Sequence, residues 1–150
     1  MNEFRRGAES FKQDKRTEKN KQIVKKRSGG LNRKGKGAAA ERMAAERLQA
    51  LGYRIIHRNW RCRTGEIDII ARDGSCWVFV EVRSRSGVAG AEEAAEAIDW
   101  RKQHKVRAVA EVYVNLYRLH EAEIRFDAVA VVLGSDPSLS PDIMVFRNAF

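Results

Sequence analysis

The chain has 150 residues, the usual length of a single domain, with ordinary apolar and aromatic content. Its formal net charge of +9 comes wholly from residues 1–36, where thirteen Lys and Arg stand against four Asp and Glu. No apolar leader or run long enough to span a bilayer is present, so we expect a soluble cytoplasmic protein without a membrane partner. The Cys and His positions show no zinc-ligand spacing.

Residues 1–36 are rich in Lys and lack a sustained apolar stripe, so we expect a disordered basic tail. Such a tail either contacts nucleic acid through phosphate neutralisation or serves only as a soluble extension, and composition does not decide between them. The single folded domain is expected over residues 37–150.

The domain alternates helix-forming and strand-forming segments. A helix is predicted over 38–51, where Ala, Glu, Arg and Leu precede Gly52 as a C-terminal stop. The apolar runs and turn signals that follow predict strands over 53–60, 65–71, 76–83, 124–133 and 143–146, and helices over 91–98 and 100–119. This order indicates an α/β fold in which helices flank a mixed β-sheet.

Two charged residues lie on stripes that should face the core. Glu41 precedes Ala44 by three residues and Leu48 by seven, which places it on the inner side of its helix or at the edge of that stripe. Lys102 lies four residues before Val106, which puts its side chain toward the sheet unless it snorkels past a short core.

The stretch GEIDIIARDGSCWVFVEVRSRS sets carboxylates among buried-strand residues. If Asp73-Gly74 is a two-residue turn, facing residue numbers sum to 147, and Glu66, Asp68 and Glu81 project from one side of the sheet. Like charges on one face destabilise a sheet, so a cation should lie between them. The sequence leaves two candidates open, an ion pair with Arg83 or a divalent metal such as Mg²⁺ or Mn²⁺.

An acidic residue followed by Glu-x-Lys at a strand end is typical of the PD-(D/E)XK nucleases, and Asp68 with Glu81-Val82-Arg83 resembles that motif. Over residues 38–150 the chain resembles the YraN-like bacterial family, described as endonuclease-like and similar in fold to archaeal Holliday-junction resolvases. The segments that carry this resemblance are AERMAAERLQALGYRIIHRNWRCRTGEIDIIARDG, FVEVRSR, RKQHKVRAVAEVYV and IRFDAVAV.

The resemblance implies a restriction-endonuclease-like sheet with a metal site for Mg²⁺ or Mn²⁺. Glu41, Asp68 and Glu81 would bind the metal, and Asp68, Glu81, Arg83 and Lys102 would be the catalytic residues. Two positions depart from the family pattern, since Ala40 replaces a glycine and Arg83 stands where the motif has lysine. Lysine can act as a base when buried, whereas arginine stays protonated, so Lys102 would have to supply a neutral amine if the reaction needs one.

Arginines gather just before the acidic hairpin. They suit contacts to a phosphate backbone, although a solvated strand face would look the same, and no base-reading motif accompanies them. The expected nucleic-acid-binding residues are Arg54, Arg58, Arg61, Arg63 and Arg85.

The sequence therefore predicts a Mg²⁺- or Mn²⁺-dependent DNA endonuclease that acts on branched or processed DNA. Symmetric cutting of two strands would call for a homodimer. The main alternative is a non-catalytic nucleic-acid-binding protein that keeps the nuclease fold, with Arg83 as the sign of lost activity. A purely structural or protein-interaction domain is the third interpretation.

Overall fold

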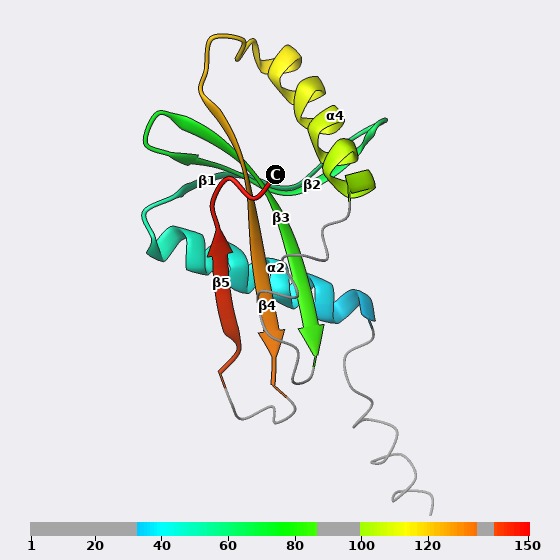
Figure 1. Ribbon diagram of the computed structural model, residues 1–150, viewed down its shortest axis with the longest axis vertical. Coiled ribbons are helices and arrows are strands. Elements are labelled where there is room, and N and C mark those ends of the chain that lie inside the picture. The colour runs from blue at the N-terminus through cyan, green and yellow to red at the C-terminus, as the bar shows by residue number, and fades with distance from the viewer. Residues whose placement is uncertain (1–32, 87–99, 135–139) are drawn as a thin grey trace, which may run out of the picture. The chain divides into compact units, whose positions relative to one another are not determined.

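The computed structural model describes residues 33–86, 100–134 and 140–150. Figure 1 shows a β-sheet flanked by two helices. The elements are α2 (Arg33–Ala50), β1 (Arg54–Cys62), β2 (Gly65–Asp73), β3 (Cys76–Ser86), α4 (Trp100–Tyr117), β4 (Ile124–Leu133) and β5 (Asp142–Phe146). The five strands form one sheet in the order β1-β2-β3-β4-β5. The predicted α/β class with a mixed sheet is confirmed.

The sheet is mixed because β3 and β4 run parallel, whereas every other neighbouring pair is antiparallel. Parallel neighbours cannot be joined by a tight turn and need a long crossover, usually a helix. Helix α4 lies in this crossover, between β3 and β4. The chemistry of the site depends on this connection, because it brings one helix of the crossover against β3.

The two helices cover opposite faces of the sheet. Alternate side chains of β3 point to opposite faces, and Val80 packs in a cluster with Leu48 of α2, whereas Phe79 packs in a cluster with Tyr113 of α4. Figure 1 shows α2 crossing β3, β4 and β5. Strands covered on both faces read as continuous apolar runs, which explains why a buried carboxylate stands out in β3.

Helix α2 begins at Arg33, so the expected domain boundary at Gly37 falls inside the helix and residues 33–36 do not belong to a disordered tail. Good helix formers surround the glycines, and a Cβ at Gly37 would meet no atom within 4 Å. The helix ends at Ala50, and Gly52 forms the predicted C-terminal stop, with φ at 91° and the Tyr53 amide donating to the carbonyl of Leu48 at 3.0 Å. Residues 1–32 and the predicted helix over 91–98 lie outside the described residues.

The β2–β3 hairpin has a different register from the predicted one. Its turn is Gly74-Ser75, because Asp73 pairs with Cys76, and facing residue numbers therefore sum to 149 rather than 147. Gly74 takes a φ of 62°, the left-handed conformation that tight hairpin turns need. The shift by two residues leaves the alternation unchanged within the paired part of the hairpin, residues 69–73 against 76–80.

A buried ionic cluster ties β4 to distant segments. Asp127 has no exposed surface, and its carboxylate accepts hydrogen bonds from Arg125 Nε at 2.8 Å, the Asn148 amide at 2.9 Å and the Tyr53 hydroxyl at 3.1 Å. Arg125 Nη2 also donates to Asp73 Oδ2 at 2.9 Å. A buried charge is tolerated when it is paired and fully hydrogen-bonded. The cluster thus joins β4 to the hairpin turn, the start of β1 and the C-terminal segment.

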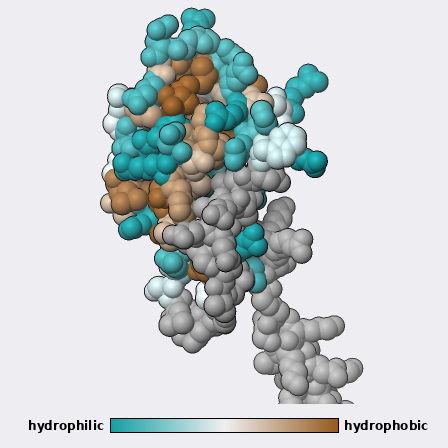
Figure 2. Space-filling model, viewed as in Figure 1, coloured by the Kyte–Doolittle hydropathy of each residue, from teal (hydrophilic) through white to brown (hydrophobic). Residues whose placement is uncertain are grey.

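Figure 2 shows one face, on which hydrophilic side chains surround smaller hydrophobic patches. The exposed large apolar side chains are those of Leu51, Trp100, Val112, Leu116, Tyr117, Ile124 and Met144. Within the described ranges, no helix combines the length and the apolar character needed to cross a membrane.

Replacing Asp127 with Ala should lower the free energy of unfolding by about 3–5 kcal/mol, because the largely buried Arg125 would lose one of its two carboxylate partners and the Tyr53 hydroxyl would lose its acceptor. Urea unfolding followed by circular dichroism measures this loss. The matched control is Glu46→Ala, which removes an exposed ion pair with Arg42 and should change stability by less than about 0.5 kcal/mol. A loss as small as the control's would show that the cluster adds no stability.

Candidate active site at the β2–β3 fork

The candidate site lies where β2 separates from β3. The ladder between them ends at the pair Ile69–Val80, although β3 continues to Ser86. Just beyond that pair, Asp68 Oδ2 accepts a hydrogen bond from the Val82 amide at 2.8 Å. A carboxylate therefore takes the place of a strand partner, and it is held against β3 at the point where the fork opens.

Asn59 of β1 lies where the β1–β2 pair twists beside Asp68. It has a φ of 52°, and it and Asp68 lie between the ladder pairs Arg58–Ile69 and Trp60–Ile67. Asn is among the few residues that tolerate this left-handed conformation. Ile67 packs in the α4 cluster, whereas Ile69 packs in the α2 cluster, so the pair twists sharply between them. No role was predicted for Asn59 from the sequence, although an Asn inside a strand is uncommon and so marks this position.

Glu81 supplies the second carboxylate. Only 2% of its surface is exposed, and its Oε1 is contacted by the ammonium of Lys102 from α4. The Nε of Arg83, on the same strand, lies 3.7 Å from the same oxygen. The helical position predicted for Lys102 is observed, while its catalytic role stays a prediction. The ion pair gives the buried carboxylate the cation that its burial requires.

The negative charge of Glu81 opposes the ionisation of Asp68. Burial, together with the negative charge of Glu81, raises the pKa of Asp68 to about 7. The Val82 hydrogen bond and the Lys102 ammonium act in the opposite direction, and Glu41 raises the pKa of Asp68 slightly further. Asp68 is thus the carboxyl of the fork that gains or loses a proton near neutral pH, as groups at functional sites often do.

The predicted metal ligands are only partly brought together. Asp68 and Glu81 converge, and Glu41 of α2 lies within electrostatic reach of Asp68. Among the residues that the structure describes, no three His, Cys, Asp or Glu side chains form a ready-made metal cage. The pair still fits Mg²⁺ or Mn²⁺, because such ions are usually held by one or two carboxylates while water and substrate phosphate complete the coordination.

Glu66 does not join the other carboxylates. Its Oε2 lies 2.9 Å from the Nε of Arg61, its neighbour across the β1–β2 ladder, and both side chains are largely exposed. The expectation that parity alone would bring Glu66 to the fork is wrong, because β1 supplies a nearer cation.

The side chains expected to bind nucleic acid are all exposed. They lie on the edge strand β1, on the turn after it and on β3, and they are Arg54, Arg58, Arg61, Arg63 and Arg85.

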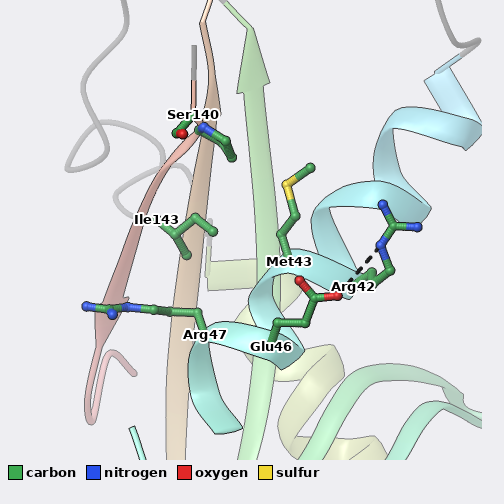
Figure 3. A pocket seen from close by; sticks show the side chains of 7 residues that line it. Arg42, Met43, Glu46, Arg47, Ser140 and Ile143 are labelled. Atoms are coloured by element: carbon green, nitrogen blue, oxygen red, sulfur yellow. Dashed lines mark ion pairs between the residues drawn. The ribbon is translucent and has the colours of Figure 1, made fainter. Parts of the chain in front are cut away.

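A separate hollow of about 730 Å³ lies between α2 and the start of β5. Figure 3 shows the side chains of Met43 and Ile143 within it and the Arg42–Glu46 ion pair at its side. None of the predicted site residues lines this hollow. The candidate site therefore rests on the side chains of the fork and not on this hollow.

Comparison with known proteins identifies relatives over most of the chain. The model of the family described as Uncharacterised protein family UPF0102 matches residues 40–131. A UPF0102 protein of Rhodococcus opacus is 42% identical over 114 residues, which is 76% of this chain and 94% of the relative. Those of Syntrophus aciditrophicus and Caldicellulosiruptor saccharolyticus are 48% and 38% identical, covering 76% and 80% of this chain and 87% and 100% of the relatives.

Asp68 should make stability depend on pH between about 4 and 7. In this window the folded chain keeps a proton on Asp68 that the unfolded chain has lost, so this group lowers the free energy of unfolding as pH rises. Asp68→Asn should remove that contribution and be more stable than the natural chain at pH 8, by on the order of 2 kcal/mol. Urea unfolding at several pH values measures both effects.

The control for this pH series is Glu66→Gln, which removes an exposed carboxylate from the same strand and should leave the slope unchanged. An Asp68→Asn chain with the same pH slope as the natural chain would show that Asp68 titrates normally.

Proposed function

The chain belongs to Uncharacterised protein family UPF0102, and we propose that it is a metal-dependent DNA endonuclease of the PD-(D/E)XK type. One observation carries this proposal. Asp68 and Glu81 converge at the fork with Lys102 and Arg83 around them, and Asp68 is destabilised in its charged form. A network of ion pairs that served stability alone would be more stable with equal numbers of acids and bases, or with neutral groups. A site for a divalent cation instead needs acids that converge.

Asp68 and Glu81 would hold Mg²⁺ or Mn²⁺, with Glu41 reaching the site from α2 as a further ligand or through water. When bound, such an ion activates water and stabilises the charge that develops in phosphodiester hydrolysis. The fork itself orients Asp68 through the Val82 amide, so one of its oxygens is held by the backbone before any ligand arrives.

Lys102 and Arg83 would together take the two roles of the motif lysine, which are to stabilise the phosphate and to exchange a proton. Arg83 stands at the motif position and stays charged, so it can steady a phosphate but cannot accept a proton. Lys102 approaches Glu81 from α4, and lysine, unlike arginine, belongs to the residue types that can serve as a base. The arrangement supports retained cleavage with Arg83 acting electrostatically.

The exposed arginines of β1 and its turn would hold the DNA backbone. A strand advances about 3.3 Å per residue, so the arginines of β1 from Arg54 to Arg61 extend over about 23 Å of the sheet edge, and Arg63 follows in the turn. Contacts of this kind depend on phosphates and carry no sequence information. We therefore propose that the protein selects branched or processed DNA by shape, and that symmetric cutting of two strands would require a homodimer.

A non-catalytic nucleic-acid-binding protein is the second candidate. The Lys102–Glu81 ion pair favours it, because the lysine already neutralises the most buried carboxylate. Calorimetric titration with Mg²⁺ and Mn²⁺ separates the two functions, with Asp68→Asn as the control. Heat from the natural chain that the variant lacks supports the endonuclease, and equal absence of heat supports the binding protein.

Arg83→Lys should raise the Mg²⁺- or Mn²⁺-dependent cleavage rate by about tenfold or more, because it restores a side chain able to exchange a proton at the motif position. Gel assays over linear, single-stranded and branched DNA measure the rates. Asp68→Asn should abolish cleavage by both the natural chain and the Arg83→Lys chain.

Glu66→Gln is the matched control, since Glu66 is an acid of the same strand that lies outside the fork, and it should cleave like the natural chain. If neither the natural chain nor Arg83→Lys cleaves any DNA form with either metal, the endonuclease proposal fails.

A further inference from the structure

The first turns of α4 carry an unusual exposed aromatic side chain. Trp100 begins the described part of the helix, and 65% of its surface is exposed. Its ring lies 5.5 Å from the guanidinium carbon of Arg101 and makes an edge contact with His104 at 5.8 Å between centroids. A large exposed aromatic bordered by cations has the composition of a surface that binds nucleic-acid bases.

The charge of this part of α4 also points to an anionic partner. Residues 100–110 contain Arg101, Lys102, Lys105 and Arg107 and no acid, and the first turn of the helix has no acidic residue. Cations near the start of a helix are unfavourable, because the helix dipole is positive there. A ligand that carries phosphates would compensate this unfavourable charge. Residues that are locally unfavourable are often found at functional sites.

This surface adjoins the fork. Lys102, two residues after Trp100, contacts Glu81, and Lys105 lies over the β1–β2 turn so closely that a Cβ at Gly65 would stand 2.8 Å from its Cε. Residues two apart project from different sides of a helix. A DNA strand that passes around the first turn of α4 would thus meet Trp100 on one side and the carboxylates on the other.

We propose that Trp100 stacks against an unpaired base of the DNA substrate while Arg101 and Lys105 hold the adjoining phosphates. The inference rests on the proposed endonuclease function and names its substrate class, which is DNA with unpaired nucleotides beside the bond to be cut. A paired base inside a duplex cannot offer its face to Trp100, because its neighbours in the stack cover both faces. Stacking on an aromatic side chain selects unpaired nucleotides without regard to sequence.

The test compares the affinities of a blunt duplex and of the same duplex with a short single-stranded gap. It uses fluorescence anisotropy and the Asp68→Asn chain, so that no cleavage interferes. We expect tighter binding of the gapped DNA, and Trp100→Ala should weaken that binding roughly tenfold while changing duplex binding little. Trp100→Phe, which keeps a ring, should retain most of the preference.

Leu116→Ala is the matched control, because Leu116 is an apolar residue at the other end of α4 with the same exposed fraction of 65%. Equal affinity for the two DNAs, unaffected by Trp100→Ala, would overturn this inference. The proposed function would then still be tested by the cleavage assays. A change of oligomeric state in Trp100→Ala, seen by light scattering without a change in DNA affinity, would also overturn it, since the ring would then belong to a contact between copies. Absence of both DNA binding and cleavage would overturn the proposed function itself.

Discussion

The arrangement of the site depends on one buried carboxylate, that of Glu81 in the central strand β3. A carboxylate that is 2% exposed must be compensated, and the compensation comes from a lysine on α4 and more distantly from Arg83 on the strand itself. Because Lys102 belongs to the crossover helix, the ion pair couples the position of α4 to the chemistry of the fork. Further along the same helix, Tyr113 packs in an apolar cluster with Ile70 and Phe79 of the sheet, which fixes the position of the helix.

The fork lowers stability locally, and ion pairs at the opposite end of the hairpin offset this loss. Beyond Ile69–Val80 the two strands no longer pair in the ladder, and the Val82 amide is satisfied by the Asp68 side chain instead. Near the turn of the same hairpin, Asp73 is held to Arg125, which is held in turn to the buried Asp127. One end of the hairpin is therefore bound to β4 by ion pairs, while at the other end a side chain takes the place of the strand ladder. Local strain at a functional site is commonly offset in this way elsewhere in the fold.

Sequence periodicity predicted the elements well, because apolar alternation, helical stripes and the Gly52 stop are local signals. It also predicted the inward orientation of Lys102, which follows from one residue per helical turn facing the sheet. The hairpin register was missed by two residues, since Asp73-Gly74 and Gly74-Ser75 are both acceptable turns and the choice depends on tertiary packing. The pairing of Glu66 with Arg61 could not be predicted either, because alternation gives the face of a strand and not the partner across it.

The charges of the fork separate the two candidate functions physically. Glu41, Asp68 and Glu81 stand against two cations, and an approaching phosphate adds further negative charge. Below pH 7 the proton on Asp68 removes one of these negative charges, whereas above pH 7 the repulsion returns in full. A protein that only binds nucleic acid at this fork would therefore lose affinity as pH rises through 7. A divalent cation replaces the proton as the compensating charge, so a nuclease that uses one would keep its substrate at the pH where the binding protein releases it.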